Sequence, residues 1–111
     1  MIYSIEKITT LIGARRIGTA DAQIGWLLTD SRSLCFPEET LFFALKTARN
    51  DGHRYIEDLY RRGVRNFVVE QESLTSHLSP LTTYTDANFL VVPSPLAALQ
   101  RLAERHRDEY N

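Results

Sequence analysis

The stretch TLFFALK at residues 40–46 carries the clearest structural signal in the chain. After its first residue it has five apolar residues in a row. It lacks the alternation of a half-exposed strand and is too short for a membrane helix, so it is typical of a strand buried on both faces. Helices cover both faces of such strands, and we therefore expect an α/β fold.

Toward the C-terminus, helix and strand patterns alternate. Residues 51–62 predict a helix with Asp51 as its N-cap and Gly63 just past its end. Strands are predicted at 66–70 and 89–92, separated by a polar loop with a short helical turn. Ser94 and Pro95 are typical of the start of a last helix. The apolar residues expected on one face of that helix are Leu96, Leu99, Leu102 and Ala103.

Toward the N-terminus, Ser4 and Gly13 frame an amphipathic helix at residues 5–12. Strands are predicted at 15–18 and 24–28. The later strand–helix–strand alternation implies right-handed crossovers and a mainly parallel sheet, whereas the first strands are free to pair otherwise. We therefore expect one small domain over residues 1–111, with a mixed, mainly parallel sheet of about four to five strands and about three helices packed on it.

Composition narrows the class of protein. A hydrophobic fraction of 43% in 111 residues suits one compact core. The 13 basic and 14 acidic side chains nearly cancel, which argues against nucleic-acid binding. A single cysteine, Cys35, favours a reducing compartment. Neither a signal peptide nor a membrane-spanning run is present in these residues, so we expect a cytoplasmic protein without membrane contact.

No catalytic or metal-binding signature is present in the sequence. The five glycines are scattered, so they form no Gly-rich phosphate-binding loop. The three histidines lie far apart and outside metal-ligand spacing. Ser31 has no neighbouring histidine to activate it. We therefore predict no catalytic residue, no metal and no cofactor within these residues.

Two polar segments follow apolar strands, where ligands collect in open α/β sheets. The first is 29–32, with Thr29, Asp30, Ser31 and Arg32. The second is 46–53, which contains Lys46, Thr47, Ala48, Arg49, Asn50, Asp51 and His53. Hydroxyls, cations and amides of this kind suit a polar anion: Ser31 for oxygens, Arg49 or Lys46 for phosphate, and Asn50 for a base edge. The alternative is ordinary turn chemistry, with Asp51 acting only as a helix cap.

An ordered set of strings resembles the N-terminal domain of the MurE and MurF ligases. These are TDSR at 29–32, LFFALK at 41–46 and DGH at 51–53, and the later strands and helices follow in the same order across essentially the whole chain. The Ala-Leu-Lys and Asn-Asp-Gly-His strings favour the MurF type over the MurE type. Two departures stand out: Thr47 occupies a position where the family usually has glycine, and Glu38-Glu39 replaces a glycine-containing turn.

The resemblance implies a cytoplasmic, ATP-dependent ligase that builds the peptide stem of peptidoglycan, and so serves cell shape and division. In that family the N-terminal domain binds the UDP end of UDP-N-acetylmuramoyl-tripeptide, to which MurF-type enzymes add D-alanyl-D-alanine. ATP and magnesium belong to a central domain, which with the C-terminal domain is absent from residues 1–111. By position, UDP-sugar contacts are expected at Thr29, Ser31, Thr47, Ala48, Arg49 and Asn50. Supporting roles are expected for Asp30, Arg32, Lys46, Asp51 and His53.

A second reading stays open. The N-terminal domain of HPr kinase resembles this fold, and fold alone does not determine function. On that reading the chain is a regulatory or partner-docking domain without affinity for a nucleotide sugar, or a domain fused to an alanine racemase. On either reading the chain alone is no enzyme, and only the larger ligase would be one.

Overall fold

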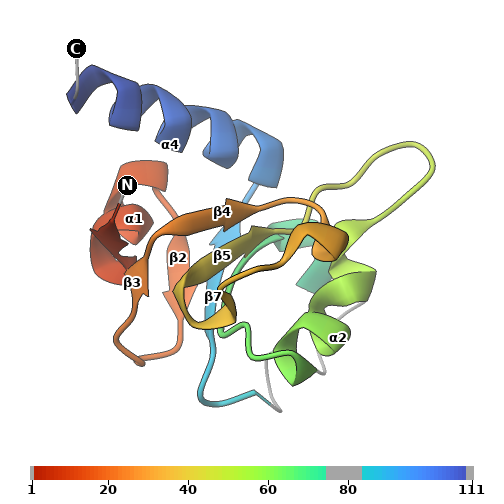
Figure 1. The fold of residues 1–111 in the computed structure, drawn as a ribbon. Helices are drawn as coiled ribbons and strands as arrows, with labels where there is room; N and C mark the ends of the chain where they lie inside the picture. The colour runs from red at the N-terminus through yellow and green to blue at the C-terminus, as the bar shows by residue number, and fades with distance from the viewer. Residues whose placement is uncertain (1, 75–83, 110–111) are drawn as a thin grey trace.

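The structure is a computed structural model that describes residues 2–74 and 84–109. A five-stranded sheet forms its centre, in the order β2-β7-β6-β5-β4 (Figure 1). These strands are β2 (Arg15–Ile17), β4 (Trp26–Leu28), β5 (Thr40–Phe43), β6 (Asn66–Glu70) and β7 (Asn88–Val92). The strands β4 to β7 run parallel, and β2 pairs antiparallel with β7. The predicted mixed, mainly parallel sheet is confirmed.

Helices cover both faces of this sheet. They are α1 (Ile5–Ile12), α2 (Ile56–Arg61) and α4 (Pro95–Glu109). The shorter 3-10 turns are η1 (Ser31–Ser33), η2 (Pro37–Glu39), η3 (Gly52–Tyr55) and η4 (Gln71–Leu74). In Figure 1, α1 and α4 lie on one side of the sheet and α2 lies on the other. None of the described helices is both long and apolar enough to cross a bilayer.

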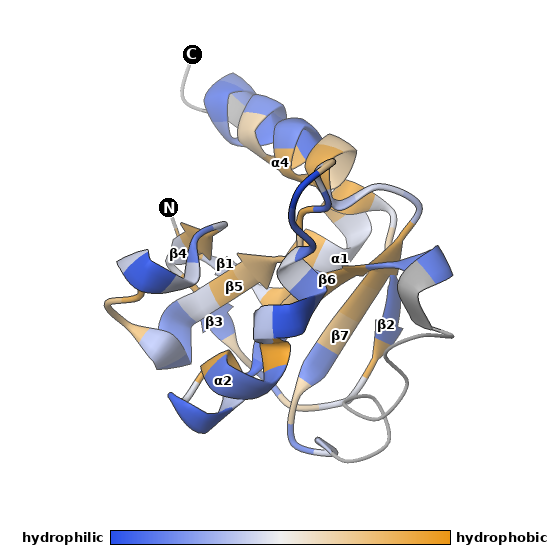
Figure 2. Ribbon diagram, turned by 90° about the vertical axis from the view of Figure 1, so that its right-hand side faces the viewer, coloured by the Kyte–Doolittle hydropathy of each residue, from blue (hydrophilic) through white to orange (hydrophobic). Residues whose placement is uncertain are grey.

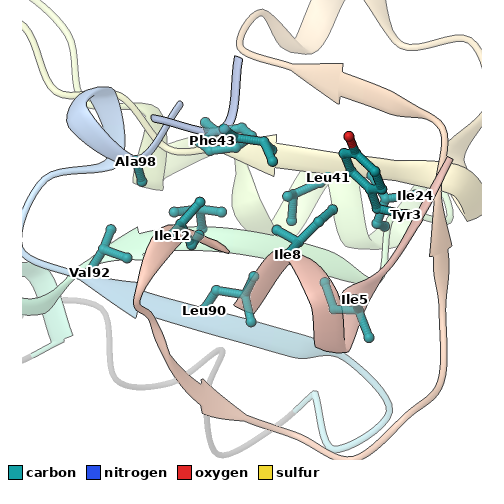
Figure 3. Close-up of a cluster of buried hydrophobic side chains, with 12 residues drawn as sticks. Tyr3, Ile5, Ile8, Ile12, Ile24, Leu41, Phe43, Leu90, Val92 and Ala98 are labelled. Atoms are coloured by element: carbon teal, nitrogen blue, oxygen red, sulfur yellow. The ribbon is translucent and has the colours of Figure 1, made fainter. Parts of the chain in front are cut away.

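Alternating side chains of β5 divide the core into two clusters. Leu41 and Phe43 join the cluster under α1 and α4 (Figure 3). Phe42 points to the opposite face and joins the cluster under α2. All three side chains are fully buried, as expected for a strand covered on both faces. In Figure 2 most of β5 and β7 is coloured as hydrophobic, whereas α2 and α4 carry both hydrophilic and hydrophobic residues.

The predicted helix ends are confirmed at Ser4, Gly13, Gly63 and Ser94, whereas the helix predicted from Asp51 begins as the 3-10 turn η3 and becomes α-helical only at Ile56. The Ser4 hydroxyl accepts from Lys7 N–H at the start of α1, and Gly13 ends that helix with φ of 65°. Gly63, with φ of 106°, ends α2, where Val64 N–H donates to Leu59 C=O. Ser94 caps α4 through Ala97 N–H at 3.2 Å. Local chemistry decides these ends, which is why the sequence predicts them.

The predicted strand at 24–28 is wrong as a single element. Gly25 divides it, and its N–H donates to Glu39 C=O. The residues before it form β3 (Gln23–Ile24), which pairs antiparallel with β1 (Tyr3–Ser4) in a separate two-stranded sheet. The strand predicted at 40–45 ends earlier, at Phe43, because Leu45 N–H turns back to Phe43 C=O.

The predicted apolar face of α4 is partly wrong. Ala98 and Leu102 are buried, but Leu96 is 51% exposed and Ala103 is also exposed. The buried line runs through residues spaced four apart, Ala98 and Leu102, and Leu96 lies about 200° around the helix from Ala98 because each residue turns about 100°. Leu96 therefore faces solvent.

Candidate functional site

A polar hollow of about 460 Å³ lies at the carboxyl ends of β4 and β5. The η1 turn follows β4, and the loop after β5 leaves the same end of the sheet in Figure 1. The hollow is lined by Thr29, Asp30, Ser31, Arg32, Asn50 and Tyr55. The two polar segments singled out in the sequence therefore meet, because parallel strands end at the same edge of a sheet.

Asp30 builds the first wall of the hollow. Its carboxylate accepts from Arg32 N–H at 2.9 Å and caps η1. The Arg32 guanidinium also donates to both Asp30 oxygens, at 3.0 and 2.8 Å. Arg62, at the end of α2, donates to Ser31 C=O at 2.9 Å and ties the turn to the helix. The Asp30–Arg32 pair is exposed, so it shapes the turn more than it stabilises the fold.

These bonds change the titration of Asp30. The side-chain hydrogen bond from Arg32, followed by its backbone N–H, lowers the pKa of Asp30 from 3.8 to about 2. The bonds should therefore be intact above pH 3.8 and be lost as the pH falls through about 2. We expect an NMR titration of the Asp30 carboxyl to have its midpoint near pH 2, and to move back toward 3.8 in Arg32→Ala. A midpoint that Arg32→Ala leaves unchanged would contradict this origin.

Two hydrogen bonds between Thr47 and Asn50 close the loop that follows β5. Thr47 N–H donates to Asn50 C=O at 2.7 Å, and Asn50 N–H donates to the Thr47 hydroxyl at 3.1 Å. Lys46 and Asp51 form an antiparallel bridge at the base of this loop. Among the described residues only glycines have positive φ, so Thr47 needs no left-handed backbone. The threonine hydroxyl thus closes the loop at a position where the family usually has glycine.

His53 holds the loop to the sheet. Its side chain is buried, with Nδ1 at 2.5 Å from Asp51 Oδ1. Its Nε2 accepts from Glu70 N–H at 2.9 Å, at the end of β6. Because Nε2 is the acceptor, Nδ1 carries the proton and donates to the carboxylate. His53 and Asp51 therefore position the loop and do not line the hollow.

The remaining predicted residues lie elsewhere on the loop. Lys46 lines a separate hollow of about 270 Å³ with Glu70 and the start of α4. Thr47, Ala48 and Arg49 are exposed and are not among the residues that line the main hollow. The structure therefore brings Asn50 to the 29–32 segment, and it leaves Lys46, Thr47, Ala48 and Arg49 outside the shared lining.

Tyr55 also lines the hollow, although it is not among the binding residues predicted from the sequence. Its hydroxyl donates to Asn50 Oδ1 at 3.4 Å, and it is only partly buried. The Asn50 carboxamide thereby keeps Nδ2 available as a donor. The sequence did contain a signal for this role, because Tyr55 lies four residues after the capping Asp51. The first turn of a helix lies next to the loop that precedes it, so a side chain there can reach that loop.

The chemistry of the hollow is that of a polar binding site. The hydroxyls of Thr29 and Ser31 make no hydrogen bond within the described residues, and the ion pair of Arg32 with Asp30 lies in the same lining. Hydroxyl, amide and guanidinium donors suit anionic oxygens. Among the described residues no group of three or more His, Cys, Asp or Glu side chains could hold a metal ion.

Comparisons with known proteins agree with this arrangement of strands and loops. The family model described as "Mur ligase family, catalytic domain" matches residues 24–107. The UDP-N-acetylmuramoyl-tripeptide--D-alanyl-D-alanine ligase of Haemophilus influenzae is 29% identical over 108 residues, covering 97% of this chain and 21% of that ligase.

Two solved structures from Acinetobacter baumannii have the same fold. MurF superposes with a TM-score of 0.77 at 19% identity, over 98% of this chain and 22% of that one. UDP-N-acetylmuramoylalanyl-D-glutamyl-2,6-diaminopimelate--D-alanyl-D-alanyl ligase gives a TM-score of 0.77 at 20% identity, with the same coverage. The chain spans about a fifth of the length of these relatives. It belongs to the Mur ligase family, and within that family it is similar to the N-terminal domain of the MurF type.

Proposed function

We propose that this chain is the substrate-recognition domain of a peptidoglycan-precursor ligase. It binds the UDP end of UDP-N-acetylmuramoyl-tripeptide, and other domains of a larger, cytoplasmic protein then use ATP and magnesium to add D-alanyl-D-alanine. In this role the domain does no chemistry of its own. Holding the nucleotide end restricts where the distant peptide carboxylate can lie, and such positioning lowers the barrier of the reaction elsewhere.

The observation that carries the proposal is the hollow shared by Ser31 and Asn50. Its volume of about 460 Å³ falls in the range of small-molecule sites, about 300–1,000 Å³. The proposal assigns the Thr29 and Ser31 hydroxyls to diphosphate oxygens and the Asn50 amide to the uracil edge. Arg49 and Lys46, on the same loop, attract the diphosphate from outside the shared lining. Attraction of this kind weakens with salt.

Titration with UDP tests the proposal directly. In an NMR titration of the 111-residue chain, UDP should shift the backbone resonances of Ser31 and Asn50 more than those of α4. Ser31→Ala combined with Asn50→Ala should weaken binding at least about tenfold, since the lost Ser31 bond to the charged diphosphate alone costs about 1.5–3 kcal/mol.

Ser33→Ala is the matched control, because Ser33 lies in the same turn but not in the lining of the hollow. It should leave UDP affinity unchanged. Resonances of the hollow that stay still at millimolar UDP would refute the proposed function, and equal losses in Ser33→Ala and the double variant would refute the assignment of the contacts.

A further inference from the structure

A second polar hollow, of about 400 Å³, lies at the opposite edge of the sheet. Asn66 and Asn88 line it, and they are the first residues of the parallel strands β6 and β7. The candidate nucleotide site lies at the carboxyl edge, so a five-residue strand, roughly 16 Å, separates the two edges. One small ligand cannot fill both hollows.

A chain of side-chain hydrogen bonds fixes the orientation of both amides. Arg16 Nε donates to Asn88 Oδ1 at 3.1 Å, and a guanidinium can only donate. Asn88 Nδ2 must therefore be the donor toward Asn66 Oδ1, at 2.9 Å, and toward Ala20 C=O, at 2.8 Å. The Asn66 oxygen is thereby used as an acceptor, and its nitrogen stands at the end of the chain.

Asn66 Nδ2 is the one buried side-chain nitrogen or oxygen in residues 2–74 and 84–109 that lacks a hydrogen-bond partner. The whole residue is 1% exposed. A buried amide donor without an acceptor costs about 1–3 kcal/mol. Because the relay from Arg16 prevents the amide from turning over, no residue in 2–74 or 84–109 supplies the missing acceptor, and the nearest open space is the hollow that Asn66 lines.

The rim of this hollow is acidic. Its carboxylates are Asp21, Glu38, Glu39 and Asp86, against one lining cation, Arg65. Asp86 is already paired with Arg65 at 3.0 Å and accepts from the Tyr60 hydroxyl. Asp21, Glu38 and Glu39 are exposed, and their carboxylates make no hydrogen bond or ion pair within the described part of the chain. Three unpaired carboxylates therefore line the same hollow as one unpaired amide donor.

We propose that this hollow docks a basic peptide segment of a partner protein. A main-chain carbonyl of the peptide accepts from Asn66 Nδ2, and its lysine or arginine side chains reach Asp21, Glu38 and Glu39. A metal ion is disfavoured because an amide N–H donor faces it, and an anion is repelled by the carboxylates. A polyamine satisfies the charges but has no oxygen for the amide. A peptide supplies both groups.

The probe is acetyl-trilysine-amide, titrated into the 111-residue chain and followed by NMR. The expected result is a shift of the Asn66 side-chain NH₂ resonances that spermidine, which has cations but no carbonyl, does not reproduce. The triple variant Asp21→Asn, Glu38→Gln, Glu39→Gln changes only exposed positions and should weaken peptide binding about tenfold. UDP affinity should be unchanged in that variant.

The matched control removes three exposed carboxylates elsewhere, through Glu6→Gln, Glu104→Gln and Asp108→Asn. It should keep peptide affinity within about twofold. If spermidine shifts the Asn66 side-chain NH₂ resonances as strongly as the peptide does, then charge alone explains the shift and the proposal is overturned. Side-chain NH₂ resonances of Asn66 that do not move during the peptide titration would also overturn it. The same holds if the chain dimerises and the dimer displaces the peptide, or if both triple variants weaken peptide binding equally.

Discussion

Truncating Phe67 to alanine is expected to lower the free energy of unfolding by about 3–5 kcal/mol. Phe67 is fully buried in β6, at the centre of the sheet. Its ring stacks on Phe89, with 5.2 Å between centroids, and meets Phe42 edge-on at 6.5 Å. Since small domains are stable by about 5–15 kcal/mol, this one change removes a large share of the stability.

Denaturant unfolding followed by circular dichroism measures this loss. Phe36→Ala is the matched control, because Phe36 is 49% exposed and its ring stacks only on the exposed Trp26. We expect the control to cost less than about 1 kcal/mol. A similar cost for both variants would show that the cluster under α2 is far more loosely packed than the side-chain geometry indicates.

The second large effect is expected from His53→Ala, at about 2–4 kcal/mol. The change leaves Glu70 N–H without its acceptor and removes the imidazole partner of the Asp51 carboxylate, which keeps its hydrogen bond from the backbone N–H of residue 53. It also opens space beneath a loop that is already close to the chain behind it. A Cβ on Gly52 would lie 2.8 Å from Leu45 N, so the loop backbone at Gly52 packs directly against the backbone that follows β5.

Hydrogen exchange separates this effect from a general loss of stability. In His53→Ala the amide of Glu70 should exchange faster than the amides of β7, and UDP binding should weaken because Asn50 is no longer held. Arg54→Ala, at the neighbouring exposed position, should change neither. Unfolding energies that match for the two variants would rule out a positioning role for His53.

The parts of the fold that depend on local chemistry could be predicted from the sequence. Ser4, Gly13, Gly63 and Ser94 bound their helices where expected, because caps use backbone groups within one turn. The break at Gly25 could not be predicted in this way. It depends on Ile24 pairing with Tyr3, some twenty residues earlier, and on a hydrogen bond to Glu39.

The candidate site, too, could be predicted only in part from the sequence. The meeting of Ser31 and Asn50 follows from the direction of parallel strands, which the helix–strand alternation predicts. Tyr55 was missed because its spacing fits the apolar face of a helix equally well. The amide pair of Asn66 and Asn88 was missed too, since only strand register places two asparagines opposite each other. UDP binding itself stays a prediction.

The cluster beneath α1 and α4 joins the two ends of the chain, with Ile5, Ile8 and Ile12 packed together with Leu90, Val92 and Leu102. During synthesis the isoleucines leave the ribosome long before their partners exist. Eighty further residues take roughly 4 to 16 seconds at about 5–20 residues per second. Throughout that interval the apolar side chains of the nascent N-terminal segment remain exposed to solvent, and exposed apolar segments of this kind are what chaperones bind.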